Sequence, residues 1–289
     1  MSPEVSRQLE DILTRKPGAG GKISRVRPVG GGSINTCFSF NFSGRDYFLK
    51  LNQAAQYPHM FELEAKGLEL LNDKGLAIPE VIAFGEAGKE QFLALGYLEQ
   101  APEDEEYFFR LGKGLAQLHS NTDKEFGLAH DNYIGSLPQA NARQRSWNEF
   151  FICQRIEPWL KQAIDAGDLP ASCAKNFQAL FNKLEDLFPK EQPALLHGDL
   201  WSGNKMNTTK GPAVFDPAVY YGHREADLAM TRLFGGFHDQ FYKGYQDTCK
   251  LEKGWEQRAE LFNLYPLLVH VMLFGGGYAQ DVLRIVRSY

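Results

Sequence analysis

The chain changes character near residue 100, and this change limits the folds that it can adopt. Residues 24–98 contain short alternating or apolar runs typical of strands, together with one helical pattern. From residue 105 onward, apolar residues recur at three- and four-residue intervals, which predicts helices over 105–120, 146–166, 171–187, 224–234, 238–249 and 255–274. A length of 289 residues is enough for two ordinary domains, or for one domain built as two lobes. We therefore predict an α+β fold with a small sheet-rich N-lobe at residues 1–98 and a larger, mostly helical C-lobe at residues 99–289.

Composition and charge argue against several classes of protein. Acidic residues outnumber basic ones by 36 to 31, which gives a formal net charge of −5, whereas dedicated nucleic-acid binders carry a basic surface. The longest apolar stretch, at 264–274, contains a proline and a histidine and is too short to span a bilayer. We expect neither a nucleic-acid partner nor a membrane segment. The oligomeric state stays open, with a monomer favoured.

Cysteine usage and the first residues point to the cytoplasm. The four cysteines lie far apart without a CxxC pair, so neither a disulfide framework nor a zinc site is expected. Between Met1 and Lys16, apolar residues at helical spacing are separated by charged ones, which predicts an amphipathic helix instead of a signal peptide. A reducing compartment is the simplest setting for such a chain.

The strongest local signal is the segment HGDLWSGN at 197–204, followed by Asp216 at the end of the next short apolar run. Asp199 and Asn204 are five residues apart, which is the spacing of the Asp and Asn in a protein-kinase catalytic loop. Phosphoryl transfer needs a carboxylate to receive the acceptor's hydroxyl proton, and it needs oxygen ligands for Mg²⁺. Asn204 and Asp216 carry such oxygens. The alternative is a polar loop in which these residues only cap turns, but their joint spacing favours phosphoryl transfer.

Two motifs resemble one family of small-molecule kinases. HGDLWSGN at 197–204 and VFDPAVYYGHREADLA at 214–229 are similar to segments of the fructosamine kinase (ketosamine 3-kinase) family. That family belongs with aminoglycoside and choline phosphotransferases in the two-lobed protein-kinase-like fold, with a small antiparallel-sheet N-lobe. The resemblance covers most of the chain. It implies ATP and Mg²⁺ as cofactors, Asp199 as the catalytic base, and Asn204 and Asp216 as the metal ligands.

The N-lobe residues fit the same resemblance. Lys50 ends a strand one hairpin after a glycine run, where a kinase places the lysine that contacts the α- and β-phosphates. Its expected partner is Glu64, because Glu62 points to a different face of the helix. The phosphate-binding loop is assigned to Gly30, Gly31, Gly32 and Ser33, and the adenine-binding hinge to Leu95, Gly96, Tyr97 and Leu98.

Trp201 follows the Asp-Leu pair of the catalytic motif, and two roles are open for it. Its ring either packs beneath the loop or forms an apolar face of the acceptor pocket that stacks on the substrate. His197 is expected to bridge backbone groups, since Asp199 already occupies the position of the base. Asp227 is expected to brace the catalytic loop from the following helix.

These observations lead to one function with two rivals. The leading hypothesis is ATP-dependent phosphorylation of the 3-hydroxyl of ketosamines such as fructosamine, ribulosamine or erythrulosamine, on a free or protein-bound amine, which implies protein deglycation. One rival keeps the chemistry but takes an aminoglycoside, choline or another small alcohol as acceptor. The other is a pseudokinase that binds nucleotide without transferring phosphate. It is disfavoured because all five polar residues of the site are present: Lys50, Glu64, Asp199, Asn204 and Asp216.

Overall fold

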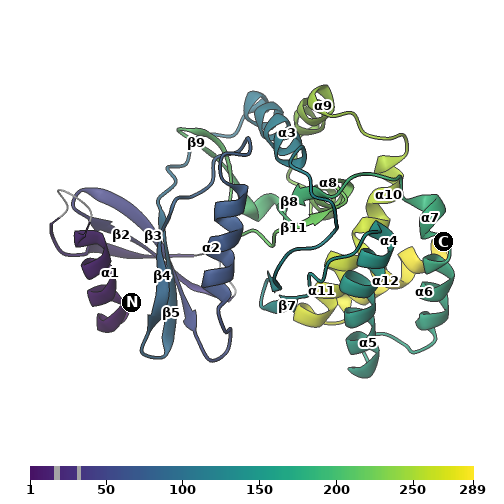
Figure 1. Cartoon of the computed structure of the whole chain (residues 1–289), viewed down its shortest axis with the longest axis horizontal. Coiled ribbons are helices and arrows are strands. Elements are labelled where there is room, and N and C mark those ends of the chain that lie inside the picture. The colour runs from purple at the N-terminus through teal and green to yellow at the C-terminus, as the bar shows by residue number, and fades with distance from the viewer. Residues whose placement is uncertain (16–19, 31–33) are drawn as a thin grey trace.

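Five antiparallel strands build the N-lobe, in the spatial order β1-β2-β3-β5-β4 (Figure 1). The structure is a computed structural model that describes residues 1–15, 20–30 and 34–289. The strands are β1 (Ser24–Val29), β2 (Thr36–Phe42), β3 (Arg45–Gln53), β4 (Val81–Ala87) and β5 (Glu90–Gly96). β3 lies at the centre and pairs with β2 and β5, so its register fixes the face on which the Lys50 side chain lies.

Two helices cover opposite faces of this sheet. α1 (Pro3–Thr14) is the predicted amphipathic helix. Ser2 caps it by accepting a hydrogen bond from a backbone N–H of the first turn, and its buried side chains pack on the outer face of the sheet. α2 (Met60–Leu71) packs on the other face, between the sheet and the C-lobe (Figure 1), and carries Glu64.

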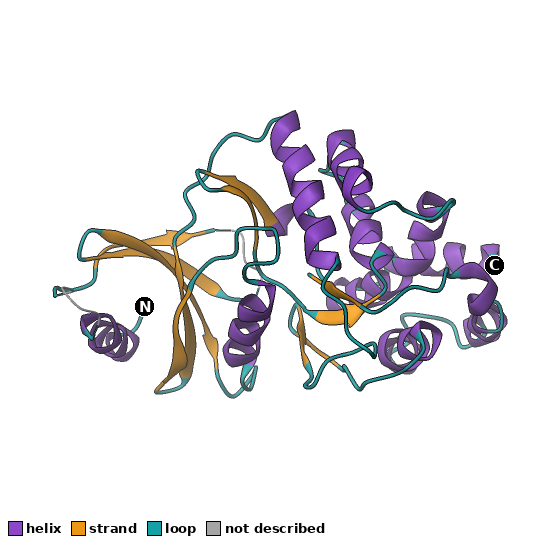
Figure 2. Cartoon of the chain, turned by 45° about the horizontal axis from the view of Figure 1, so that its top comes forward, coloured by secondary structure: helices purple, strands orange, loops and turns teal. Residues whose placement is uncertain are grey.

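The C-lobe is mostly a group of helices (Figure 2), and they enclose one large apolar core. Its α-helices are α3 (Glu105–His119), α4 (Trp147–Phe150), α5 (Glu157–Asp165), α6 (Cys173–Phe181), α7 (Leu184–Leu187), α8 (Glu225–Leu233), α9 (Asp239–Thr248), α10 (Trp255–Phe262), α11 (Leu264–Phe274) and α12 (Gly277–Ser288). The predicted α+β architecture, with a small antiparallel sheet followed by a helical remainder, is confirmed. Within the described part of the chain, no helix is both long and apolar enough to cross a membrane.

Three predicted helices are irregular along their length. The helix over 146–166 contains a π-helical segment, η1 (Phe151–Ile156), and those over 171–187 and 255–274 are each divided in two. In the last of these, Pro266 lacks a backbone N–H. It therefore lies in the first turn of the new helix α11, where no such donor is needed.

Three two-stranded sheets lie between the helices of the C-lobe. They are β6 (Asn132–Ile134) with β7 (Leu137–Gln139), β8 (Ala194–Leu196) with β11 (Tyr220–Gly222), and β9 (Lys205–Thr208) with β10 (Gly211–Val214). The sequence patterns do not predict β6, β7, β9 or β11, because runs of three or four residues are too short to show a period. β8 leads into the HGD segment and β10 leads to Asp216. These strands therefore position the predicted catalytic residues.

Candidate active site

A cleft of about 1050 Å³ is lined by residues of both lobes. All the predicted site residues that the structure describes line it: Gly30, Lys50, Glu64, Leu95, Gly96, Tyr97, Leu98, Asp199, Trp201, Asn204 and Asp216. The remaining predicted residues, Gly31, Gly32 and Ser33, lie outside the described residues. Segments far apart in the sequence therefore meet in one cavity, as a two-substrate reaction requires.

Lys50 joins the two lobes through two short ion pairs. Its Nζ lies 2.6 Å from Glu64 Oε1 on α2 and 2.6 Å from Asp216 Oδ1 in the C-lobe. Glu62, by contrast, pairs with Lys66 on the surface of α2. Burial alone would lower the pKa of Lys50, but the two carboxylates raise it, so the amine stays charged. A fixed positive charge at this place is suited to phosphate oxygens.

The turn that presents Asp199 depends on a glycine. Gly198 has φ = 83°, in the left-handed region, and a Cβ at this position would lie 2.0 Å from the Ala218 carbonyl oxygen. Any other residue would strain the turn and displace the backbone that follows Asp216. Steric constraints therefore require a glycine between His197 and Asp199.

His197 and Asp227 hold the same turn from the interior of the C-lobe. His197 donates a hydrogen bond through Nε2 to the Phe215 carbonyl, at 3.0 Å. Asp227, on α8, accepts from the backbone N–H groups of His197 (2.8 Å) and Gly198 (2.9 Å). Burial would raise the pKa of Asp227, but its hydrogen bond with His119 and the neighbouring histidines and N–H groups lower it. Asp227 thus stays charged and fixes the backbone next to Asp199.

Asp199 and Asn204 are in direct contact. Asn204 is the last residue of the 3₁₀ turn η2 (Ser202–Asn204), and Asp199 lies three residues before this turn begins. Asn204 Nδ2 donates to the Asp199 carboxylate (Oδ2, 3.1 Å) and to the Asp199 backbone carbonyl (2.9 Å). It also lies 3.5 Å from the Asp216 carbonyl. These contacts bring all three predicted catalytic and metal-binding residues together.

The oxygen atoms that remain fit a hard divalent cation. Asn204 Oδ1 accepts no hydrogen bond from the described residues, and the Asp216 side chain is 44% exposed. Mg²⁺ prefers oxygen donors and commonly takes one or two from protein side chains, with water and phosphate completing its coordination. Asn204 and Asp216 can therefore hold Mg²⁺ together with a nucleotide.

The environment of Asp199 gives its carboxyl group an unusual proton affinity. Burial raises the pKa of Asp199 to about 7, and the neighbouring Asp216 carboxylate adds to the rise, while the hydrogen bond from Asn204 opposes it. A carboxylate with a pKa near neutrality can accept a proton and release it again at physiological pH. This is a property of a general base.

Aromatic side chains line the cleft on the C-lobe side. Trp201 is 39% exposed, and its ring folds over Gly203, where a Cβ would meet the indole at 2.2 Å. Phe234 and His270 line the same cleft, with ring centroids 4.9 Å apart. The Trp201 ring therefore contacts its own loop and is also partly exposed toward the cleft, so both predicted roles stay open. His270 is not predicted as a site residue from the sequence, where its only signal is a polar residue inside an apolar helical run.

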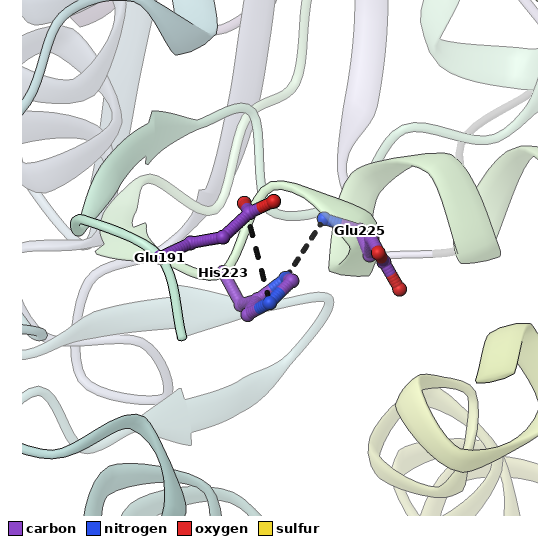
Figure 3. A group of neighbouring side chains, drawn as sticks. All are labelled: Glu191, His223 and Glu225. Carbon is purple, nitrogen blue, oxygen red and sulfur yellow. Dashed lines mark hydrogen bonds and ion pairs between the residues drawn. The ribbon is translucent and has the colours of Figure 1, made fainter. Parts of the chain in front are cut away.

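A second cluster of ionisable groups, Glu191, His223 and Glu225, lies outside the cleft (Figure 3). Two bidentate ion pairs occupy its carboxylates, Glu191 with Arg224 and Glu225 with Arg258. His223 uses Nε2 to donate to a backbone carbonyl and Nδ1 to accept from the Glu225 N–H, and burial lowers its pKa to about 4. These atoms are committed to one another, so the cluster is a structural network and not a metal site.

Sequence comparisons relate the chain to kinases. A sequence model of the fructosamine kinase family matches residues 3–289. A Vibrio parahaemolyticus protein, named a probable ketoamine kinase, is 39% identical over 291 aligned positions that cover 99% of each chain. A Synechocystis protein with the same description is 38% identical and covers 99% of this chain and 97% of its own.

Solved structures agree with this relationship. A Thermobifida fusca protein assigned as a fructosamine-3-kinase superposes with a TM-score of 0.89 at 32% identity, over 100% of this chain and 99% of that one. The aminoglycoside phosphotransferase APH(4)-Ia, in complex with AMP-PNP and hygromycin B, gives a TM-score of 0.65 at 20% identity, which shows a shared fold. The protein is a kinase, and its chain belongs to the fructosamine kinase family.

Proposed function

We propose that the protein transfers the γ-phosphoryl group of ATP to the 3-hydroxyl of a ketosamine, with Mg²⁺ as the metal ion. The observation that carries the proposal is the contact between Asp199 and Asn204 in a cleft that also contains the Asp216–Lys50 pair. The names of the related proteins suggest the acceptor class, a ketoamine or fructosamine. The candidate acceptors are fructosamine, ribulosamine and erythrulosamine, on a free or protein-bound amine.

The proposed step moves one proton and one phosphoryl group. The acceptor oxygen forms a bond to the γ-phosphorus while the bond from that phosphorus to the bridging oxygen of ADP breaks. The hydroxyl proton passes to the Asp199 carboxylate, and the electron pair of the broken bond leaves with ADP. The products are ADP and the ketosamine 3-phosphate, after which Asp199 returns its proton to solvent.

The charged residues around Asp199 would bind the nucleotide. Lys50, which pairs with Asp216 in this structure, would contact the α- and β-phosphates, and Asn204 and Asp216 would hold Mg²⁺. The metal ion would neutralise charge on the phosphate oxygens during transfer. The adenine is assigned to the segment from Leu95 to Leu98, where β5 ends.

The instability of the product suggests what the reaction would do in a cell. A ketosamine 3-phosphate is unstable, so phosphorylation would release the amine from its sugar adduct. The proposed reaction therefore implies removal of sugar from glycated amines, including those on proteins.

An acceptor screen tests the proposal. The purified protein is incubated with ATP, Mg²⁺ and one acceptor at a time, and ADP is followed with a coupled assay. We expect turnover with at least one of the fructosamine, ribulosamine and erythrulosamine adducts of lysine. Turnover only with an aminoglycoside or choline would contradict the ketosamine assignment. Nucleotide-dependent thermal stabilisation without ADP release from any acceptor would indicate a pseudokinase.

The pH dependence of the reaction should follow Asp199. The base must be deprotonated to accept a proton, so activity should rise with pH through its pKa of about 7. We expect kcat/KM to fall about tenfold per pH unit below that value. A pH profile from 5.5 to 8.5 measures this effect, and a flat profile across that range would contradict the raised pKa of Asp199.

Trp201 should matter for the acceptor and not for the nucleotide. Trp201→Ala removes the ring from the cleft, and we expect the acceptor KM to rise about tenfold, since a stacked aromatic ring contributes about 1–3 kcal/mol. The ATP KM should change less than twofold. Gly203→Ala is the matched variant, because its Cβ would displace the same ring. Equal loss of ATP and acceptor affinity would show that Trp201 only supports the loop.

A further inference from the structure

The three residues after Asp216 lie in a tightly enclosed position. Asp216 itself has φ = 57°, a left-handed conformation that is uncommon outside glycine. Ala218 and Val219 are buried and lie before β11, so their carbonyl groups have no strand partner there. Buried carbonyl groups of this kind need hydrogen-bond donors from elsewhere in the protein.

Two side-chain amides of the hairpin β6–β7 donate these hydrogen bonds. Asn132 Nδ2 donates to the Val219 carbonyl at 2.9 Å. Gln139 Nε2 donates to the Ala218 carbonyl at 3.1 Å. The hairpin thus holds two consecutive carbonyl groups, starting two residues after the predicted metal ligand.

Asn132 is the centre of this buried network. Its Oδ1 accepts from Gln139 Nε2 at 2.8 Å and from Asn141 Nδ2 at 2.9 Å. Asn141 Oδ1 in turn accepts from the fully buried Arg155 at 2.7 Å. Since two donors occupy Oδ1, the amide of Asn132 has one orientation, with its nitrogen toward Val219.

The N-lobe encloses the same segment from the other side. A Cβ at Gly67 of α2 would lie 3.2 Å from Val219 Cγ2 and 3.6 Å from Pro217, so the helix backbone packs directly on this segment. The hairpin also reaches the N-lobe, because the Tyr133 hydroxyl donates to the Pro58 carbonyl at 3.1 Å. The segment therefore lies between α2 and the hairpin, with little freedom to shift.

We propose that Asn132 is a positioning residue for the metal site, which acts through the Val219 carbonyl to hold Asp216 where it can bind the divalent cation. This inference rests on the proposed function for the identity of that site. Residues that orient metal ligands from behind commonly change metal affinity by about 10–100-fold when they are replaced. Asn132 lies at the edge of the cleft, but its side-chain amide is engaged by Val219, Gln139 and Asn141. Its replacement should therefore weaken the metal-dependent part of nucleotide binding and leave the metal-independent part unchanged.

Calorimetry with AMP-PNP tests the proposal without requiring turnover. The dissociation constant of AMP-PNP is measured once with Mg²⁺ and once with EDTA. The ratio of the two constants is the gain in nucleotide affinity that the metal provides, called here the metal-dependent gain. For Asn132→Ala and Asn132→Asp, which both remove the donor to Val219, we expect this gain to shrink about tenfold. The affinity measured in EDTA should stay within twofold of the wild type.

Asn263→Ala is the matched control. Asn263 is as buried as Asn132 and also donates to a backbone carbonyl, at 2.9 Å, but that carbonyl belongs to Ala229 on α8 and not to the segment after Asp216. The Asn263→Ala variant should have a lower melting temperature than the wild type and the same metal-dependent gain. The proposal is overturned if Asn132→Ala keeps the full metal-dependent gain in affinity, if Asn263→Ala loses as much of that gain as the Asn132 variants do, or if neither Asn132 variant folds. Failure of the acceptor screen with an intact metal-dependent gain would reject the proposed reaction alone.

Discussion

Asp199→Asn is expected to lower kcat by roughly 10²–10⁴-fold, because the amide cannot accept the hydroxyl proton. The substitution preserves the shape of the side chain and an oxygen that can accept the Asn204 hydrogen bond. Binding of Mg²⁺ and AMP-PNP should therefore change less than threefold. Single-turnover kinetics measures the chemical step, and calorimetry measures the binding. Turnover within tenfold of the wild type would remove the general-base mechanism.

The same variant should be more stable than the wild type at alkaline pH. The pKa of Asp199 rises from about 3.9 in the unfolded chain to about 7 in the folded protein, so folding takes up a proton between these values. The native state therefore loses stability as the pH rises through that window, and asparagine avoids this loss. We expect an increase of about 1–3 kcal/mol in the free energy of unfolding at pH 8, and much less at pH 5. If the variant and the wild type differ in stability by the same amount at pH 5 and pH 8, the Asp199 carboxylate has an ordinary pKa.

Lys50→Met is expected to reduce kcat by at least about 100-fold and to destabilise the fold. Loss of a fixed charge that stabilises the transition state commonly costs about 10²–10³ in kcat. The methionine also leaves the buried Glu64 carboxylate without its partner, which costs about 3–5 kcal/mol for a buried pair. Denaturant unfolding and steady-state kinetics measure the two effects.

A double variant separates these two roles of Lys50. Lys50→Met with Glu64→Gln removes the unpaired buried charge, so most of the lost stability should return. Activity should not return, because the charge that contacts the phosphates is still absent. Recovery of activity along with stability would mean that Lys50 serves only to hold the lobes together.

The candidate site can be predicted from the sequence where a residue with a known chemical role occupies a recognisable position in a strand, helix or short loop. Lys50 lies in β3, although this strand continues to Gln53 and does not end at Lys50 as predicted. Glu64 lies on a helix whose apolar face is clear, so the contact between the two residues can be inferred. Asp199 and Asn204 are joined by a short loop, so their five-residue spacing is enough to bring them into contact. The roles assigned to these residues stay predictions until the variants are measured.

Other features depend on contacts that no local pattern encodes. The hairpin of Asn132 and Gln139 consists of two three-residue strands, and its amides contact a segment some 80 residues away in the sequence. His270 lies in an apolar helix and becomes part of the cleft only through tertiary packing. The π-helical segment at 151–156 has the same apolar spacing as the α-helices around it. Such features arise from tertiary contacts, and neither hydrophobic periodicity nor short sequence motifs encode these contacts.

The most direct test of the account is ³¹P NMR of a reaction that contains the protein, ATP, Mg²⁺ and a lysine-bound ketosamine. We expect a new phosphate monoester on carbon 3 of the sugar, formed in equal amount with ADP and at least about 100-fold more slowly with Asp199→Asn. A phosphate on another carbon, or ADP formed without any phosphorylated sugar, would contradict it.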